Sequence, residues 1–147
     1  MLRDSEFLNL AIQEADKAFV KDEVPVGAVI VKSDEVIAFA HNEKESSNDI
    51  TAHAEILALR RASEQLGDWR LTGCTLYCTL EPCVMCAGAI FHSRIDRVVF
   101  CAWDYKWGGL GSKVDLCCLG LNHSLDVLCL PNERYQQTLS AFFKSKR

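Results

Sequence analysis

The sequence lacks several features that would place it among membrane, fibrous or strongly basic proteins. No uninterrupted apolar run approaches the roughly 20 residues that a membrane-spanning helix needs. There are only three prolines and eight glycines, with no internal repeat, which excludes a collagen-like chain. Basic residues do not outnumber acidic ones, since the formal net charge is −4 and the sequence pI is about 5.5. Bulk charge therefore argues against a strongly basic nucleic-acid binder and favours, as a first interpretation, an enzyme acting on small molecules.

The remaining composition is that of an ordinary globular protein. Hydrophobic residues make up 49% and charged residues 24% of the 147 positions, which excludes disorder and coiled coil. A chain of this length is close to the usual size of one domain, so we expect residues 1–147 to form a single domain. The first six residues do not show the basic-then-apolar order of a signal peptide, and we therefore expect a cytoplasmic protein with no membrane partner.

Cysteine is unusually frequent for such a protein. Eight cysteines occur, at positions 74, 78, 83, 86, 101, 117, 118 and 129. In a reducing compartment, this number indicates metal ligands together with small buried hydrophobic residues rather than disulfides. We expect six of the eight to belong to the second group, because a free cysteine packs like a small apolar residue.

Hydrophobic periodicity predicts an α/β protein. Helices are expected over residues 4–20, 52–66, 82–92 and from Pro131 to Phe143, and strands over 26–31, 36–40, 74–80, 97–101 and 125–130. Thr51 is the expected cap of the second helix, and residues 41–49 are expected to form a loop. Strands that alternate with helices after an opening hairpin imply a three-layer α/β/α sandwich with a mixed five-stranded sheet.

Two short motifs determine the predicted chemistry. The first is His53-Ala54-Glu55 and the second is Pro82-Cys83-Val84-Met85-Cys86, each at the expected start of a helix. Cys83 and Cys86 are three residues apart and so face the same way from a first helical turn, where unpaired N–H groups favour thiolates. One histidine and two thiolates provide three zinc ligands and leave the fourth position open, which is typical of catalytic zinc. The competing interpretation is a structural zinc closed by His41, His92 or His123, but a structural site has no need of a neighbouring carboxylate such as Glu55.

The order of these motifs resembles the signature of the zinc-dependent nucleobase deaminases, H-x-E followed by P-C-x-x-C. The resemblance implies a cytidine deaminase-like fold in which His53, Cys83 and Cys86 hold one Zn²⁺ per chain. It also implies that Glu55 shuttles protons and is not a metal ligand. Zinc in such a site activates water at neutral pH, and the carboxylate moves the proton that hydrolysis requires.

A closer similarity extends over nearly the whole chain. The segments that carry it are 24–28, 51–55, 79–89, 92–95, Asp104-x-Lys106-x-Gly108, Gly111-Ser112 and the terminal Phe142-Phe143. They are similar to those of the bacterial tRNA-specific adenosine deaminases. This similarity implies hydrolytic deamination of adenosine to inosine at the wobble position of a tRNA anticodon, usually by a homodimer. The partner it implies is a tRNA anticodon loop, whose bases are splayed out and read by hydrogen bonds.

The same similarity nominates residues that bind substrate, namely Asn42, Arg94, Asp104, Lys106 and His123. Asn42 carries an amide that can read both donor and acceptor edges, or it makes a local turn. Arg94 either meets phosphate or joins a dimer interface. Trp103 and Trp107 flank Asp104 and either stack on unpaired bases or pack the loop.

Two other functions compete with RNA editing. One is a deaminase of a free base or nucleoside (guanine, cytosine or cytidine) with the same zinc and glutamate chemistry. The other is a zinc-binding subunit that presents RNA to another chain, in which Glu55 would have no purpose. The distribution of charge permits RNA: residues 1–90 hold 8 basic and 15 acidic residues, whereas residues 91–147 hold 8 basic and 5 acidic.

Overall fold

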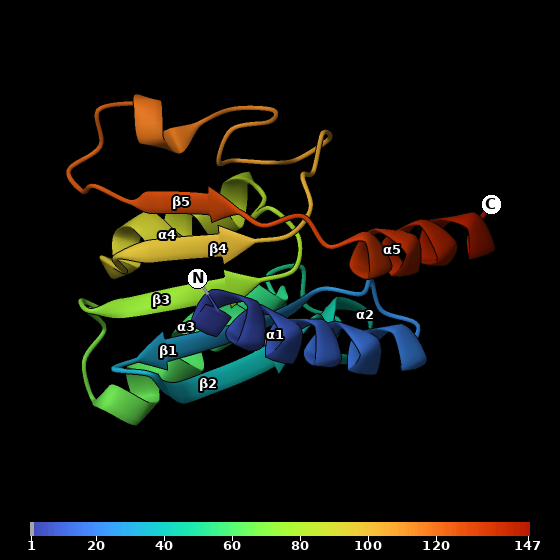
Figure 1. The fold of residues 1–147 in the computed structure, drawn as a ribbon, viewed down its shortest axis with the longest axis horizontal. Helices are drawn as coiled ribbons and strands as arrows, with labels where there is room; N and C mark the ends of the chain where they lie inside the picture. Colours follow the sequence, from blue (N-terminus) through green and yellow to red (C-terminus); the bar gives the residue numbers. More distant parts are fainter. Residues whose placement is uncertain (1) are drawn as a thin grey trace.

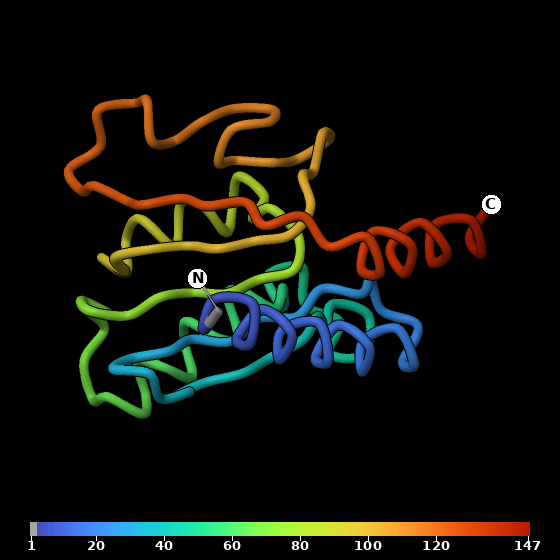
Figure 2. Tube along the Cα trace, in the orientation of Figure 1, coloured from blue at the N-terminus to red at the C-terminus, as the bar shows by residue number. Residues whose placement is uncertain are grey.

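The chain folds around a mixed five-stranded sheet, described here for residues 2–147 of a computed structural model. The strands are β1 (Gly27–Lys32), β2 (Glu35–His41), β3 (Cys74–Cys78), β4 (Arg97–Phe100) and β5 (Asp126–Cys129), and their order across the sheet is β2-β1-β3-β4-β5 (Figure 1). The helices are α1 (Leu2–Val20), α2 (Lys44–Ser47), α3 (Ala54–Leu66), α4 (Val84–Ser93) and α5 (Glu133–Ser145). A 3-10 turn at Leu116–Cys118 interrupts the long connection from β4 to β5, which can be followed in the trace (Figure 2).

Strand directions bring three loops to one edge of the sheet. β1 is antiparallel to both β2 and β3, and β4 is parallel to β3 and β5. Strands β2, β3, β4 and β5 therefore all end at the same edge. The segments that follow them, including residues 42–53, 79–83 and 101–115, consequently start from a common region. Ligands bind preferentially at this kind of edge in α/β sheets.

Helices cover both faces of the sheet, as the sequence predicts. Helices α3 and α4 pack on one face through a core that includes Ile30, Leu76 and Val98. Helix α1 packs on the other face with Val29 and Val99, and Tyr135 at the start of α5 joins the same core. The three-layer α/β/α sandwich with a mixed sheet is thus confirmed.

Helix α1 lies unusually close to β1 at one glycine. A Cβ atom placed on Gly27 would overlap the carbonyl oxygen of Ala11 and the backbone nitrogen of Ala15. Ala11 and Ala15 are fully buried, so both elements present their smallest residues at this contact. Only glycine lets the backbones of helix and strand approach this closely.

Three local predictions were wrong. The expected loop over 41–49 contains the short helix α2. Thr51 does not cap α3, because His53 is the N-cap and Thr51 instead donates both its N–H and its hydroxyl to Asp49 Oδ1. Helix α4 begins at Val84, two residues later than expected.

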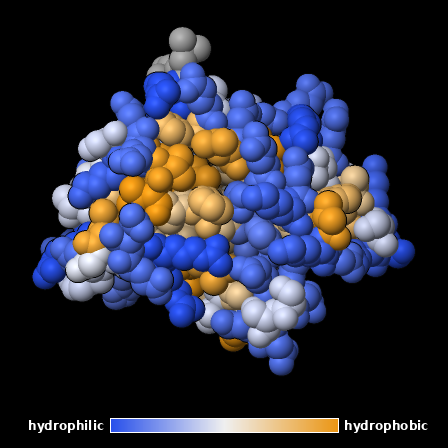
Figure 3. All heavy atoms as spheres, turned by 90° about the horizontal axis from the view of Figure 1, so that it is seen from below, coloured by the Kyte–Doolittle hydropathy of each residue, from blue (hydrophilic) through white to orange (hydrophobic). Residues whose placement is uncertain are grey.

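Strand β2 is the outermost strand on one side of the sheet, and it exposes apolar surface there. Phe39 on this strand is 56% exposed, and a patch of hydrophobic side chains among hydrophilic ones appears where the molecule is seen from below (Figure 3). The guanidinium of Arg61 on α3 donates to the carbonyl oxygen of Phe39 at 2.9 Å. This contact occupies a backbone carbonyl of the outermost strand that would otherwise be free to pair with another strand.

No helix within residues 2–147 is both long enough and apolar enough to cross a bilayer.

A buried ion pair ties the first turn of α1 to the sheet. The Asp4 carboxylate accepts two hydrogen bonds from Arg97 at the start of β4, at 2.7 and 2.8 Å, and a third from the Tyr77 hydroxyl at 2.6 Å. The hydrogen bonds from Arg97 and Tyr77 lower the pKa of Asp4 from 3.8 to about 2, against the opposing effect of burial. The ionised form of Asp4 is therefore favoured by folding.

We expect this ion pair to make stability depend on acid pH. A carboxyl group whose pKa is lower in the folded state contributes stability above its unfolded pKa and loses it as the pH falls. The contribution should be on the order of 2 kcal/mol at neutral pH and should disappear between about pH 4 and pH 2. Denaturant unfolding of the wild type and Asp4→Asn from pH 2 to 7 measures it. A difference between the two proteins that does not narrow below pH 4 would contradict this assignment.

Candidate active site

Two helix starts meet at the edge where β2 and β3 end. His53 is the N-cap residue of α3, and Glu55 lies in the first turn of that helix. Cys83 is the N-cap residue of α4, and Cys86 lies in its first turn. Both helices therefore direct the positive ends of their dipoles at the same group of side chains, which favours negatively charged groups there.

The three predicted metal ligands lie together. The Nδ1 atom of His53 is 3.6 Å from the Cys83 sulfur and 3.5 Å from the Cys86 sulfur. One potential ligand atom of each residue lies within 4.8 Å of the others, and this is the only such group of three or more found in residues 2–147. The structural-zinc alternative needs a fourth protein ligand, which the described part of the chain does not place here. His41 instead contacts Glu14 and Lys21, and His123 contacts the Ile95 carbonyl.

The two cysteines and His53 shift one another's pKa values. The hydrogen bond from the Cys86 thiol lowers the pKa of Cys83 to about 4. The same contact, followed by burial, raises the pKa of Cys86 well above its ordinary value. The hydrogen bond with Cys83 raises the pKa of His53. A cation between the ligands would favour the thiolate form of both cysteines, because its positive charge stabilises negatively charged sulfur.

Glu55 is buried beside this group with an unused oxygen. Its side chain is 3% exposed, and Oε1 has no hydrogen-bond partner among the described residues. Burial raises the pKa of Glu55 to about 7. A buried carboxylate oxygen without a partner is rare in folded proteins and indicates a position meant for another group. The His, Cys and Cys donor set, the two helix starts and this free oxygen together fit a catalytic zinc site with a water-derived reactant beside Glu55.

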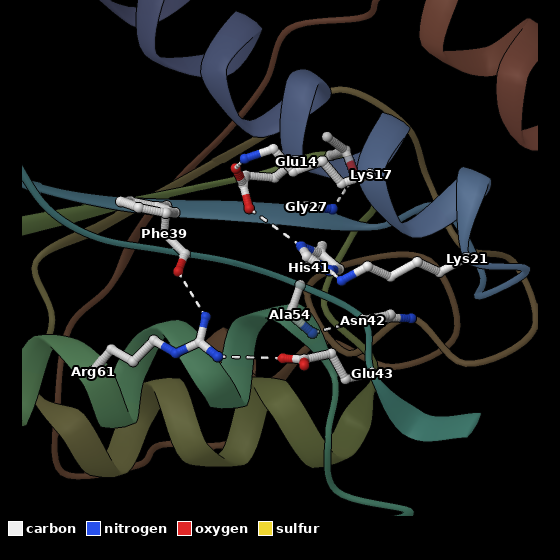
Figure 4. Close-up of polar contacts among 11 residues, drawn as sticks. Glu14, Lys17, Lys21, Gly27, Phe39, His41, Asn42, Glu43, Ala54 and Arg61 are labelled. Carbon is white, nitrogen blue, oxygen red and sulfur yellow. Dashed lines mark hydrogen bonds and ion pairs between the residues drawn. The ribbon is translucent and has the colours of Figure 1, made fainter. Parts of the chain in front are cut away.

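Asn42 supports the start of α3. Its Oδ1 atom accepts a hydrogen bond from the backbone N–H of Ala54 at 2.7 Å (Figure 4). Asn42 thereby satisfies a helix N–H group next to His53, which is the capping role predicted for Thr51. The amide N–H₂ group and the second lone pair of Oδ1 stay available to a ligand. Contact of Asn42 with the substrate stays a prediction.

The residues on either side of Asn42 are held by separate contacts. His41 Nδ1 lies 3.3 Å from Glu14 on α1, and Lys21 Nζ lies 3.1 Å from His41 Nε2 (Figure 4). Glu43 pairs with Arg61 on α3 at 3.2 Å. The segment that carries Asn42 is thus fixed to both α-helical layers.

Asp104 and Lys106 lie in the loop that follows β4, and this loop contacts the start of α4. The Trp107 carbonyl accepts the N–H of Val84 at 3.0 Å, and Cys83 forms an isolated β-bridge with Gly108. The Asp104 carboxylate accepts the N–H groups of Lys106 and Trp107, so it shapes the loop. The structure thereby brings these two predicted residues to the same edge as the candidate metal ligands.

The structure does not bring Arg94 and His123 to this edge. Arg94 is the C-cap residue of α4, about 16.5 Å along the helix from Cys83 at 1.5 Å per residue, and its guanidinium donates to the Phe91 carbonyl. His123 precedes β5 and contacts the Ile95 carbonyl at 2.7 Å. Both lie at the opposite edge of the sheet, where β4 and β5 begin. Contact of either residue with RNA stays a prediction.

The aromatic residues of the loop divide between the two alternatives. Trp103 packs edge-on against Phe100 with ring centroids 5.0 Å apart, yet it remains 40% exposed. Trp107 is 67% exposed. Trp103 therefore does pack the loop, while both side chains keep surface on which a base can stack.

Sequence analysis missed the role of Glu81. It stands inside the segment 79–89, but its side chain is only 1% exposed and accepts hydrogen bonds from Asp104, Leu110 and Ser112. The available signal was a carboxylate that directly follows a strand-like apolar stretch. A carboxylate at this position lies next to the end of a buried strand, where it needs hydrogen-bond donors from the protein.

Comparisons with known proteins agree with this geometry. Residues 1–102 match the family model of the cytidine and deoxycytidylate deaminase zinc-binding region. The chain is 48% identical to a tRNA-specific adenosine deaminase of Aquifex aeolicus over 142 residues, which cover 96% of this chain and 94% of the relative.

Two solved structures show how the similarity is graded. One comes from biochemical and structural studies of A-to-I editing by tRNA:A34 deaminases at the wobble position of transfer RNA. It matches with a TM-score of 0.83 and 46% identity, over 86% of this chain and 98% of that chain. A guanine deaminase of Bacillus subtilis matches with a TM-score of 0.65 and 29% identity, over 97% of this chain and 92% of that chain. The sequence identity is higher for the structure from the tRNA deaminase studies.

We expect Cys83→Ala to lose most of the bound zinc. Removing one of three protein ligands should weaken binding by at least about 100-fold, since loss of an outer contact to a ligand already costs 10- to 100-fold. Zinc per chain after dialysis is the measurement, and Cys74→Ala is the control because that fully buried thiol lies at the opposite edge of the sheet. Retention of one zinc per chain by Cys83→Ala would refute the ligand assignment.

Proposed function

Because the chain belongs to the tRNA-specific adenosine deaminases, within the cytidine and deoxycytidylate deaminase zinc-binding family, we propose that it converts adenosine to inosine at the wobble position of a tRNA anticodon. The observation that carries the proposal is the meeting of His53, Cys83 and Cys86 beside a buried glutamate with a free oxygen. The reaction is hydrolytic, so the enzyme is a hydrolase of a carbon–nitrogen bond.

One zinc ion per chain would be held by His53, Cys83 and Cys86. Such an ion supplies the Lewis acidity that makes water a nucleophile near neutral pH. The three residues stand at the N-termini of α3 and α4. A rigid set of three ligands leaves room for the reacting water.

Glu55 would carry the protons of the reaction. Water adds its oxygen to C6 of adenine, the bond from C6 to the exocyclic amine breaks, and ammonia leaves. The two protons of the water must move to the ring nitrogen N1 and to the departing amine. A buried carboxylate with an unpartnered oxygen can accept and deliver each in turn without bulk solvent.

A pocket beside the long loop offers a place for the neighbouring nucleotides. It has a volume of about 490 Å³ and lies between the loop after β4 and helix α5. Its lining is aromatic and polar: Ala102, Trp103, Tyr105, Gln136, Leu139, Ser140, Phe143, Lys144 and Arg147. Aromatic side chains of this kind stack on unpaired bases.

Two cations at this pocket are free to meet phosphate. Lys144 and Arg147 form no ion pair within residues 2–147, whereas Lys146 between them pairs with Asp22. Lys106 is likewise without an ion pair in that range and lies in the adjoining loop. These residues supply a local positive surface in a protein whose net charge is −4.

Two further properties are part of the proposal. Val84 and Met85 are 43% and 38% exposed in the first turn of α4, beside the candidate ligands, and a second copy of the chain would cover them in the expected homodimer. We also expect the enzyme to work in the cytoplasm, where its tRNA substrate is.

We expect Glu55→Gln to lose deamination and keep the metal. The amide cannot accept the proton of water, so turnover of an anticodon stem-loop should fall by about 100- to 10,000-fold. Inosine formation and zinc content are measured on the same preparations, with Glu64→Gln on the exposed side of α3 as the control.

The same assay separates RNA editing from the other functions. Free adenosine, guanine, cytosine and cytidine are offered beside the stem-loop. Turnover of a free base without turnover of the RNA would contradict the proposed substrate. Wild-type activity in Glu55→Gln would contradict the role of Glu55 as proton carrier. A wild-type protein that binds zinc but deaminates none of these substrates would contradict the proposal that it is an enzyme.

We expect Lys144→Ala/Arg147→Ala to weaken RNA binding and make it less sensitive to salt. Each phosphate contact to single-stranded nucleic acid contributes about −0.7 to the slope of log affinity against log salt. Loss of two contacts should reduce the slope by about 1.4, which binding titrations from 50 to 300 mM salt can resolve. Lys32→Ala, at the opposite edge of the sheet, is the control; an equal change in that variant would refute a local phosphate surface.

A further inference from the structure

We propose that Glu81 is a positioning residue that holds the long loop in the shape needed to bind RNA. The loop comprises residues 102–112 and carries Asp104 and Lys106. The proposal rests on the proposed function for its effect on substrate, but the holding of the loop is a property of this chain on its own.

The Glu81 carboxylate is surrounded by donors from this loop. Oε1 accepts the N–H of Asp104 at 3.0 Å and the hydroxyl of Ser112 at 2.5 Å. Oε2 accepts the N–H of Leu110 at 3.0 Å and the N–H of Ser112 at 3.1 Å. Four hydrogen bonds thus converge on one carboxylate from three positions spread over nine residues of the loop.

No cationic side chain within residues 2–147 pairs with the Glu81 carboxylate. Glu81 is 1% exposed, and no lysine, arginine or histidine within residues 2–147 forms an ion pair with it. A buried carboxylate without hydrogen bonds is very unfavourable, so the four donors are what make its burial tolerable. The loop conformation that presents all four donors is therefore strongly favoured over any other.

The loop backbone is shaped around this carboxylate. A Cβ atom on Gly108 would overlap the Glu81 carboxylate and the Ser112 hydroxyl. The Ser112 hydroxyl oxygen also lies 2.6 Å from the Asp104 carbonyl oxygen, so the two ends of this stretch of loop are in contact. Contact with the Glu81 side chain thus explains why position 108 is glycine and position 112 is serine.

The residues next to Glu81 attach the same loop to the metal-ligand helix. The N–H of Glu81 donates to the Ala102 carbonyl at 2.8 Å, and the Pro82 carbonyl accepts the N–H of Gly109 at 2.9 Å. Cys83 follows directly. Residues 81–83 therefore fix the distance between the loop and a metal ligand, so the loop is set in place before RNA arrives.

Pre-ordering of this loop should appear in binding more than in chemistry. A loop that is disordered in the free protein must be ordered when RNA binds, and that cost raises KM. Glu55 lies in the first turn of α3, whereas the loop's backbone hydrogen bonds join residues 81–84 at the start of α4. The greater part of any loss should thus fall on KM, and a smaller part on kcat.

The test compares Glu81→Gln and Ser112→Ala with the wild type. Glu81→Gln keeps the shape but opposes an amide N–H₂ group to backbone donors, and Ser112→Ala removes one donor while leaving the carboxylate. We measure amide hydrogen exchange in residues 102–112 and zinc per chain without RNA. We then measure KM and kcat for the anticodon stem-loop. Asp4→Asn is the matched control, because it removes a buried, hydrogen-bonded carboxylate at the opposite edge.

We expect faster exchange at Asp104, Leu110 and Ser112 in Glu81→Gln, with one zinc per chain retained. KM should rise about 10- to 100-fold, and the rise in Ser112→Ala should be smaller. Asp4→Asn should leave both loop exchange and KM unchanged. Unchanged loop exchange, or a loss confined to kcat, overturns the proposal. If the wild type fails to deaminate the stem-loop, the proposed function fails, and the exchange result still decides whether Glu81 holds the loop.

Discussion

The convergence of two helix N-termini at one edge of the sheet is the constraint on which the rest of the site depends. His53 and Cys83 are N-cap residues, so each ligand is placed by the same geometry that starts its helix. The unpaired N–H groups of both helices favour thiolates and a carboxylate in a small volume. The parallel direction of β2 and β3 follows from their shared antiparallel neighbour β1, and it brings the two helix starts together.

Local sequence patterns predict much of this arrangement. Alternation of apolar stretches predicted all five strands and four of the five helices, because burial on one or two faces gives each element its own period. The spacing of Cys83 and Cys86 predicted that both thiolates face the same way, and the resemblance to the deaminases implied that His53 joins them. The boundary at Thr51 could not be predicted, since the cap came from Asn42, a residue distant in sequence that supplies a better-placed acceptor. Local propensity yields to tertiary contacts at such points.

The loop after β4 shows the other limit of prediction. Its glycines and tryptophans mark an irregular segment, but no local pattern reveals that Glu81 lies at its centre. A lone acidic residue is usually exposed, and only the fold shows that four donors surround this one. The separation of Arg94 and His123 from the site has the same origin, because it depends on which edge of the sheet each connection reaches.

The candidate metal ligands and the pocket lining come from different parts of the chain. The ligands and Glu55 lie before residue 90, whereas the pocket with its aromatic and basic lining is built from residues 102–147. The candidate metal ligands and the proposed nucleotide pocket thus come from consecutive stretches of the chain, and the hydrogen bonds of Glu81 join the first stretch to the loop of the second. Side chains that line the pocket can therefore change without touching the candidate ligands, as long as the loop still offers its donors to Glu81.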